Sequence, residues 1–209
     1  CKLTLECCDL TCGAADVVRS EGAQISVTRC CVQGGEACGI AIGHGGRAAL
    51  VGNDIHSNAC AGVFIFGAGS TANLTDNKLR DGSDEGIVVA DGGRAILNRN
   101  QIHGNDTEGV LVHSNAVVMM GPNSIRDNGH ARIERTEDEL STWVGDDGAE
   151  YYRSGKGFAG VRIHTGSSAR MHTGLNDTTA DNGKGVLQME VDDSSRVVWS
   201  KSFDGRAVD

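Results

Sequence analysis

Short runs of alternating apolar and polar residues recur along this chain, and most of them start directly after a glycine. Val or Ile follows the glycine, and successive glycines lie 23, 24 and 23 residues apart, with one later interval of 25 residues. Alternation over four or five residues is typical of a β-strand with one face toward a core. These strands start at Gly39, Gly62, Gly86, Gly109, Gly160 and Gly185, and Asp16 falls at the same phase upstream.

Asparagines recur at fixed distances from these glycines. One set precedes a short strand in each repeat and comprises Asn53, Asn77, Asn100 and Asn123. A further set, Asn58, Asn105 and Asn128, follows that strand. Asn and Gly tolerate the left-handed backbone that sharp corners need, and stacked Asn side chains can hydrogen-bond from one repeat to the next. We therefore expect these asparagines to be structural.

The repeat predicts an all-β chain folded as a right-handed single-stranded parallel β-helix, with about eight coils of about 23 residues. Helical repeats would need apolar residues three and four positions apart, and a β-propeller blade needs about 40 residues. We expect a single domain over residues 1–209, with residues 186–209 as a C-terminal coil or cap. The positions expected to point inward are Ile40, Ile42, Val63, Ile65, Ile87, Val89, Val110, Val112, Val161 and Ile163.

Residues 130–158 interrupt the repeat. Gly109 and Gly160 lie 51 residues apart, so the stretch is either a degenerate coil or an insertion that loops out of one coil. We favour the insertion because no repeat motif occurs in it, and insertions in repeat proteins often carry function. Its candidate binding residues are Trp143, Tyr151, Tyr152, Asp146 and Asp147.

Charge and hydropathy narrow the classes of partner. The formal net charge of −9 argues against a nucleic-acid surface. No run of about 18 apolar residues occurs, so we expect no membrane insertion and a soluble protein, with an intracellular location favoured. The chain starts at Cys1 rather than Met, so we expect a preceding segment that holds any targeting signal.

Four polar residues share one edge of the predicted strands and are weak catalytic candidates. His113 and His164 lie four residues after their coil glycines, and His44 and Asp91 lie five after theirs. If residues 130–158 loop out, His113 and His164 are one coil apart, at about 5 Å. Such a row could perform acid–base chemistry, because histidine titrates near neutral pH. The alternative, which we favour, is that they are turn residues at a solvated corner.

All eight cysteines lie within the first 60 residues. Cys7–Cys8 and Cys30–Cys31 are 23 residues apart, close to the phase that Asn occupies later. Buried thiols, coil-to-coil disulfides and a zinc site are the three alternatives. We favour buried thiols because free Cys is commonly buried, and the absence of a CxxC pair counts against zinc. His56 and His103 share a phase two coils apart, about 10 Å, which is too far for one metal ion. We expect no metal and no cofactor.

The coils from Gly39 to Asn128 resemble the CASH-type β-helix of the F-box-only proteins, within the pectin-lyase-like class. The matching text is N-D-I-H-S-N-A-C-A-G-V-F-I, N-K-L-R-D-G-S-D-E-G-I-V-V and N-Q-I-H-G-N-D-T-E-G-V-L-V. In that family the repeat implies a substrate-receptor surface within a ubiquitin ligase. The same fold also hosts polysaccharide enzymes, and Gly43-His44-Gly45 with Asp146-Asp147 matches two elements of the polygalacturonase pattern. Its other two elements, N-T-D and R-I-K, are absent.

Three functions are consistent with the sequence. We rank first a non-catalytic recognition or scaffold module that binds a protein partner through a β-sheet face and residues 130–158, because repeat architectures supply extended surfaces. The second is a carbohydrate-active β-helix, either an enzyme or a polysaccharide-binding domain. The third is a structural subunit of a larger assembly.

Overall fold

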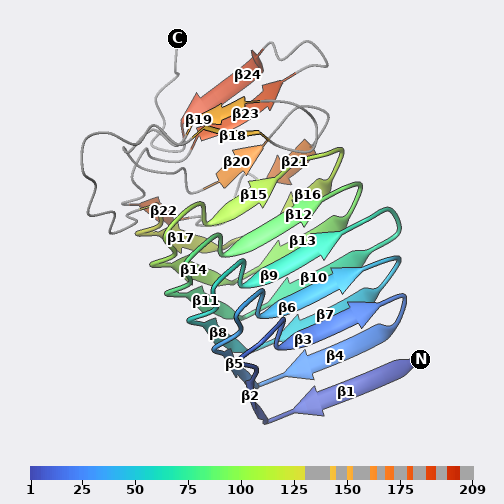
Figure 1. Ribbon diagram of the computed structural model, residues 1–209. Helices are drawn as coiled ribbons and strands as arrows, with labels where there is room; N and C mark the ends of the chain where they lie inside the picture. The colour runs from blue at the N-terminus through green and yellow to red at the C-terminus, as the bar shows by residue number, and fades with distance from the viewer. Residues whose placement is uncertain are drawn as a thin grey trace.

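The coils stack along one axis, and their strands form three parallel β-sheets that run the length of the stack (Figure 1). The computed structural model describes residues 1–129 in full and, beyond them, only the backbone of seven short strands between residues 142 and 202. Within residues 1–129 five coils are complete, and no helix occurs in that part of the chain. The prediction of an all-β parallel β-helix is confirmed. None of the described residues forms a helix long and apolar enough to cross a membrane.

Each coil contributes one strand to each sheet. Sheet A contains β1 (Lys2–Glu6), β4 (Gln24–Thr28), β7 (Arg47–Val51), β10 (Thr71–Thr75), β13 (Arg94–Asn98), β16 (Val117–Met120) and β21 (Ser168–Met171). Sheet B contains β2 (Asp9–Thr11), β5 (Cys31–Gln33), β8 (Asp54–His56), β11 (Lys78–Arg80), β14 (Gln101–His103), β17 (Ser124–Arg126) and β22 (Thr178–Ala180). Sheet C contains β3 (Val18–Glu21), β6 (Ile40–Gly43), β9 (Val63–Phe66), β12 (Ile87–Ala90), β15 (Val110–Val112) and β20 (Val161–Ile163).

Two antiparallel pairs lie outside these sheets. β18 (Thr142–Val144) pairs with β19 (Glu150–Tyr152), and β23 (Leu187–Val191) pairs with β24 (Val197–Ser202). The predicted insertion at residues 130–158 and the predicted cap at residues 186–209 otherwise lie outside the described residues. In sheet C, β15 pairs directly with β20, with Val110 opposite Val161.

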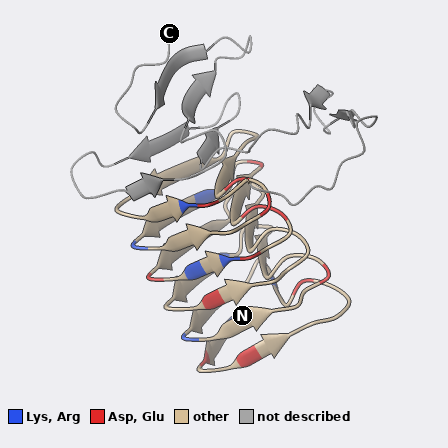
Figure 2. Ribbon diagram, turned by 90° about the vertical axis from the view of Figure 1, so that its left-hand side faces the viewer, with Lys and Arg blue, Asp and Glu red and all other residues tan. Residues whose placement is uncertain are grey.

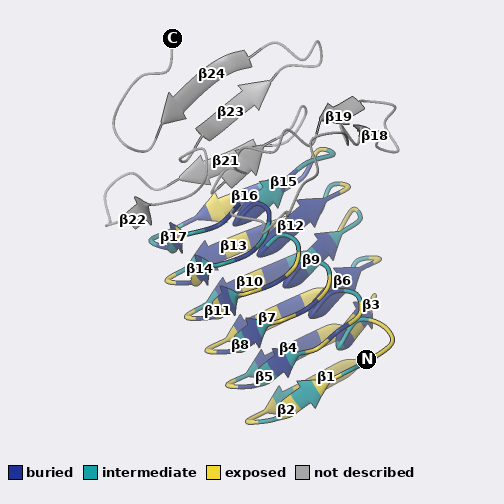
Figure 3. Ribbon diagram, turned by 60° about the vertical axis from the view of Figure 1, so that its left-hand side comes forward, coloured by how far each residue is buried: buried dark blue, intermediate teal, exposed yellow. Residues whose placement is uncertain are grey.

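Alternate residues of each strand fill the interior, and Figure 3 shows the buried positions running from coil to coil. Aligned side chains in sheet C are fully buried, as Ile40, Val63, Ile87 and Val110 show at 0% exposed. The glycine before each strand is needed because of its neighbour in the next coil. A Cβ on Gly39 would lie 2.6 Å from the carbonyl oxygen of Gly62, far inside van der Waals contact.

The first coil departs from the phase expected from the sequence. β3 pairs with β6 with Val18 opposite Ile40, so Val17 takes the glycine position and Asp16 aligns with Cys38. The backbone agrees, because Val18 N–H donates to the Gly39 carbonyl. The placement of Asp16 at the glycine phase is therefore wrong by one residue, and Asp16 stands at the start of sheet C.

Asparagines form a continuous buried ladder between sheets A and B. Asn53 Nδ2 donates to Asn77 Oδ1 at 2.9 Å, Asn77 Nδ2 to Asn100 Oδ1 at 3.0 Å, and Asn100 Nδ2 to Asn123 Oδ1 at 3.0 Å. Asn105 and Asn128 repeat the contact at the next corner. Each side chain satisfies backbone groups that the corner removes from water, which is the usual requirement for buried polar groups.

Candidate functional site

The outer surface of sheet C is apolar, although it does not face the core. Its outward residues, which we call the sheet C face, are Arg19, Ala41, Phe64, Val88 and Leu111 in one column and Glu21, Gly43, Phe66, Ala90 and His113 in the next. Ala41, Val88 and Ala90 form an apolar cluster separate from the interior, with Phe64, Phe66 and Leu111 packed against it. A sheet with one solvated face normally alternates apolar and polar residues, so this second apolar layer is unusual.

Two aromatic rings stand at the centre of this face. Phe64 and Phe66 are the only Phe, Tyr or Trp residues within residues 1–129. Their rings stack with centroids 4.7 Å apart and an interplanar angle of 23°, and His44 meets Phe66 edge-on at 5.7 Å. The Phe66 ring lies over Gly43 of the preceding coil, where a Cβ would come within 2.6 Å of Cε2. Gly43 therefore makes room for the ring.

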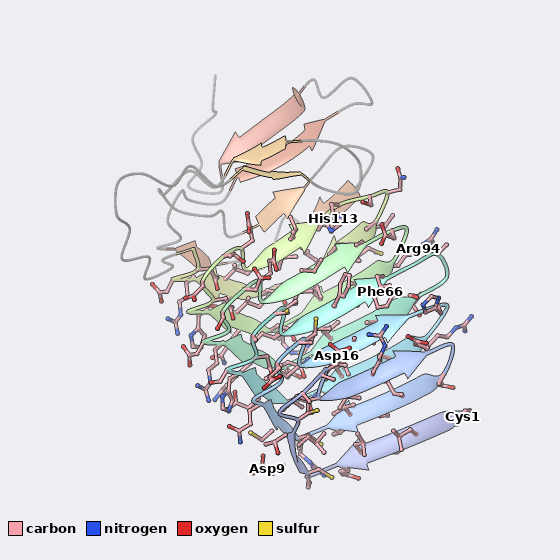
Figure 4. The ribbon with its side chains drawn as sticks, in the orientation of Figure 1. Cys1, Asp9, Asp16, Phe66, Arg94 and His113 are labelled. Atoms are coloured by element: carbon pink, nitrogen blue, oxygen red, sulfur yellow. The ribbon has the colours of Figure 1, made fainter. Side chains whose placement is uncertain are left out.

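Arg19 extends across the small residues of the second coil to reach the aromatic pair. Its Cζ lies 5.8 Å from the Phe66 ring centroid, within the range of a cation–π contact. Its guanidinium donates to Glu21 Oε1 at 2.8 Å and to Asp16 Oδ2 at 2.9 Å. Figure 4 shows Asp16 and Phe66 on this side of the stack. The face thus holds one guanidinium between two carboxylates and a ring.

Carboxylates line the edge at which the sheet C strands begin. We call Asp16, Asp84, Glu85 and Glu108 the acidic edge; Glu85 and Glu108 directly precede the coil glycines. Glu108 is only 3% exposed, and Asp84 Oδ1 accepts a hydrogen bond from Thr107 Oγ1 at 3.2 Å. Burial, reinforced by the carboxylates of Asp84 and Glu108, raises the pKa of Glu85 to about 8. The edge therefore groups carboxyl groups in a partly desolvated place, where Glu85 keeps its proton at neutral pH.

Two thiols lie beside the acidic edge. Burial raises the pKa of Cys38 to about 12, and the neighbouring Asp16 adds to the effect. Burial followed by Asp84 and Asp16 also raises the pKa of Cys60. Raised pKa values keep both groups as neutral thiols at neutral pH, so neither has the thiolate character of a nucleophile.

The opposite edge of sheet C holds the histidines and Asp91 singled out in the sequence. His44 and Asp91 are exposed and have φ of 52° and 53°, in one column with Gly22, Gly67 and Ser114, which also have positive φ. They are corner residues two coils apart, at about 10 Å, and the structure does not bring them together. His113 is half-buried, and its Nδ1 lies 2.9 Å from Ser114 Oγ. His164 lies outside the described residues.

The candidate binding residues of the 130–158 stretch are placed only in part. Trp143 lies on β18 and is opposite Tyr151 on β19, and Tyr152 follows it on the same strand. Asp146 and Asp147 lie outside the described residues. The structure therefore does not relate these residues to the sheet C face.

The cysteines continue the asparagine ladder toward the first coil. Cys30 N–H donates to Asn53 Oδ1 at 2.9 Å, and Cys8 N–H lies 3.4 Å from Cys30 Sγ. All eight cysteines are free thiols. Cys31 Sγ lies 3.5 Å from His56 Nε2, but burial raises the pKa of the Cys31 thiol. Within the described part of the chain no three His, Cys, Asp or Glu residues are grouped so as to hold a metal ion.

In sheet B an arginine separates the two other histidines of residues 1–129. His56, Arg80 and His103 align on three neighbouring strands, so the two histidines are two coils apart. Arg80 is held by Asp54 at 3.0 Å and by Asp81 at 2.7 Å. The coloured ribbon in Figure 2 shows acidic and basic residues interspersed along the coils. Sheet B therefore offers mostly charges that are already paired.

Sequence reasoning missed the residues that stand out most on this surface. It assigned the inward positions of sheet C and left Phe64, Phe66, Glu85 and Glu108 without a role. A signal was present, because V-F-I-F and I-V-V-A are continuous apolar runs rather than alternating ones. Such runs indicate a strand with apolar residues on both faces.

A match to a protein-family model supports the architecture. The family model described as a right handed beta helix region matches residues 12–195. Comparison with curated proteins yields no match. The fold is similar to the periplasmic alginate epimerase AlgG, with 13% identity, a TM-score of 0.49, and coverage of 81% of this chain and 39% of that one.

Two further solved structures, both from Azotobacter vinelandii, are similar in fold. The A-module of mannuronan C-5 epimerase AlgE6 has 16% identity, a TM-score of 0.44 and coverage of 88% and 48%. The A-module of AlgE4 has 15% identity, a TM-score of 0.42 and coverage of 90% and 58%. The chain spans 39% of the length of AlgG, 48% of the AlgE6 module and 58% of the AlgE4 module. Because the family model covers most of its length, this chain belongs to the right-handed β-helix family.

Proposed function

We propose that this chain is a non-catalytic recognition module that binds a protein partner through the sheet C face. The observation that carries the proposal is the second apolar layer, in which Phe64, Phe66 and Leu111 pack over Ala41, Val88 and Ala90 outside the core. Ala41, Val88 and Ala90 are buried in this layer, whereas Phe64, Phe66 and Leu111 remain partly exposed. Exposed apolar side chains that lie together and are rimmed by polar residues mark interaction sites in soluble proteins. Stacked coils provide such a surface over several strands without catalytic residues.

Two other features support a protein partner. Aromatic residues are enriched among the residues that contribute most to protein interfaces, and both aromatic residues of residues 1–129 lie on this face. The sequence resemblance to the β-helix of F-box-only proteins also implies a substrate-receptor role. We include residues 130–158, with Trp143, Tyr151 and Tyr152, as a second part of the binding surface.

Selection from a random peptide library on the full chain tests the proposal. We expect enriched peptides that bind the wild-type protein and lose at least tenfold in affinity on Phe64→Ser and, separately, on Leu111→Ser. The matched control is Ile96→Ser, because Ile96 is an apolar residue on sheet A that is 40% exposed. Circular dichroism establishes that each variant is folded. Peptides that bind Phe64→Ser and Leu111→Ser as tightly as wild type would overturn the proposal.

A carbohydrate-active function is the second candidate, and the acidic edge favours it. Glycosidic-bond chemistry uses two carboxyl groups held in different protonation states, and burial raises the pKa of Glu85 to about 8 beside the Asp84 carboxylate. Turnover on a panel of uronic-acid and neutral polysaccharides, assayed across the pH range and lost in Glu85→Gln and Glu108→Gln, would establish it. Absence of turnover on the whole panel would remove it.

A further inference from the structure

We propose that Cys8 and Cys30 are a redox-sensitive modification site, at which a disulfide joins the first coil to the second under oxidising conditions. The structure shows the reduced form of this site, in which both side chains are free thiols. The inference does not depend on the proposed recognition function, because the pair lies at the corner between sheets A and B rather than on the sheet C face. It is carried by the register of the coils at this corner.

The register places the two cysteines directly above one another. Asp9 pairs with Cys31 in sheet B, so Cys8 and Cys30 occupy the preceding position on neighbouring coils. The backbone agrees, because Cys31 N–H donates to the Cys8 carbonyl at 2.9 Å. Aligned Cα atoms on neighbouring parallel strands lie about 4.8 Å apart, within the range of about 4.4–6.8 Å that a disulfide spans.

The two side chains also take the same orientation. Cys30 Sγ lies 3.4 Å from the backbone nitrogen of Cys8. Each thiol donates to the carbonyl two residues earlier in its own coil, which is that of Glu6 in the first coil and that of Thr28 in the second. Cys30 belongs to the interior cluster and Cys8 packs against it. Two Cβ atoms at one coil's spacing need to approach by less than about 1 Å to reach the separation in a disulfide, about 3.5–4.5 Å.

The pair stands where the asparagine ladder ends. From Asn53 onward, amide hydrogen bonds join one coil to the next. Cys30 offers the Cys8 N–H only a sulfur atom, which is a weak acceptor. The first coil is also less buried than the second, since β1 is exposed at four of its five positions and β4 at one. A disulfide would therefore add a link at the rung where the amide ladder gives none.

No other two of the eight cysteines are aligned on neighbouring coils, and all eight lie in the described residues. Cys7 lies opposite Arg29, one position beyond the end of the β1–β4 pairing. Cys38 aligns with Ala61 rather than with Cys60. Burial also raises the pKa of both Cys38 and Cys60, which slows thiol–disulfide exchange at these residues.

A low-molecular-weight disulfide such as glutathione disulfide supplies the oxidising equivalents. Cys8 is partly exposed and reacts first, because its thiolate can attack one sulfur of glutathione disulfide, which forms a mixed disulfide and releases one glutathione thiolate. The thiolate of Cys30, a residue only 2% exposed, then attacks the Cys8 sulfur and displaces the second glutathione. The two thiol protons pass to the released glutathione thiolates, so two protein thiols are oxidised and one glutathione disulfide is reduced.

The disulfide would close a loop that contains the first strand of sheet C. Residues 9–29 include β2, β3 and β4, and β3 carries Arg19, which reaches the Phe66 ring. A crosslink removes conformational freedom from the opened state of such a loop, so oxidation should stabilise the first coil against local opening. The redox state of the pair would thereby set how firmly β3 is held on the stack.

Disulfide mapping and hydrogen exchange on the full chain test the inference. The reduced protein is equilibrated with glutathione disulfide, the remaining thiols are blocked with N-ethylmaleimide, and linked peptides are identified by mass spectrometry. We expect the predominant link to join Cys8 to Cys30. We also expect the backbone amides of residues 18–21 to exchange at least tenfold more slowly in the oxidised protein than in the reduced protein.

Three variants locate the effect, and circular dichroism establishes that each is folded. Cys8→Ser and Cys30→Ala should each abolish the slowing of exchange by glutathione disulfide. Cys12→Ser should behave as wild type, because it removes a partly exposed thiol that aligns with Gly34 and not with a cysteine. A predominant link between any other two cysteines, the absence of a link, or equal slowing in wild type and Cys8→Ser would overturn the inference.

Discussion

At the scale of single residues, Asn77 shows what holds one coil on the next. Its Nδ2 donates to Asn100 Oδ1 at 3.0 Å and to the Leu50 carbonyl at 2.9 Å. Its Oδ1 accepts from the backbone N–H of Asn53 at 3.0 Å and from Asn53 Nδ2 at 2.9 Å. All four contacts are buried, so the loss of this one side chain leaves several polar groups without partners.

Asn77→Ala should lower the free energy of unfolding by about 2–4 kcal/mol, because buried backbone groups would lose their hydrogen bonds. Urea denaturation followed by circular dichroism measures the loss. Asn73→Ala is the matched control, since Asn73 is exposed on sheet A and its loss should change the value by less than about 0.5 kcal/mol. Equal stability of the two variants would contradict a structural role for the ladder.

Gly43→Ala should destabilise the protein by about 1–3 kcal/mol, because the added Cβ overlaps the Phe66 ring. In the double variant with Phe66→Ala the overlap disappears, so the two effects should be clearly less than additive in thermal or urea unfolding. Gly13→Ala serves as a control, because no atom lies within 4 Å of a Cβ at that position. Strict additivity would show that the ring does not lie over Gly43 in solution.

At the scale of elements, sheet C differs from its neighbours in having apolar residues on both sides. Strand β12, Ile87–Ala90, is buried at all four positions, whereas β13 of sheet A, Arg94–Asn98, alternates exposed and buried residues. Glu85 and Glu108 lie two residues before the start of β12 and of β15, at the edge of this double-sided burial. Desolvation by that packing is what raises the pKa of Glu85.

The stability contributed by Glu85 should fall as the pH rises. Its folded-state pKa of about 8 exceeds its ordinary value of 4.5, so the folded protein binds the proton more tightly than the unfolded chain. The contribution is complete below pH 4.5 and is lost as the pH rises through about 8. Glu85→Gln should therefore be more stable than wild type by about 1–3 kcal/mol at about pH 9, and nearly equal to it at about pH 5.

Thermal unfolding at both pH values measures this difference. Glu36→Gln is the control, because Glu36 is an exposed acidic residue outside the acidic edge. A pH profile of Glu85→Gln that runs parallel to wild type would show that Glu85 has an ordinary pKa in the folded protein.

At the scale of the whole molecule, stacking is local, since each coil contacts only the coils before and after it. The parallel pairing of β15 with β20 joins residues 110–112 to residues 161–163 across a long stretch of sequence. Removing residues 130–157 would leave Gly109 and Gly160 separated by 23 residues, the regular period.

We predict that a variant lacking residues 130–157 folds and melts within a few degrees of wild type, because the shortened connection matches the other coils. Circular dichroism and thermal unfolding measure the outcome. A control in which a Gly/Ser linker of equal length replaces the segment separates loss of the residues from shortening of the chain. Failure of both variants to fold would indicate that the segment is a degenerate coil and part of the stack.

Much of this fold could be read from the sequence, because one coil obeys the same local rules as the next. The glycine step, the asparagine corners and the inward positions such as Ile40 and Val110 recur with the period. Each requirement arises from contacts at fixed phase, such as the approach of the Gly62 carbonyl to Gly39. Such requirements therefore select the same residue types at the same positions in every coil.

The candidate site depended on tertiary structure, because its residues belong to different coils and no local rule links them. Register decided that Asp16 stands at the start of sheet C, one residue from the phase read in the sequence. Packing decided that Phe66 lies over Gly43 and that Arg19 reaches the ring across a whole coil. The sequence by itself determined the period and the interior of the β-helix, since burial repeats along the chain. Only the stacking of coils placed the aromatic pair and the acidic edge on one outer face.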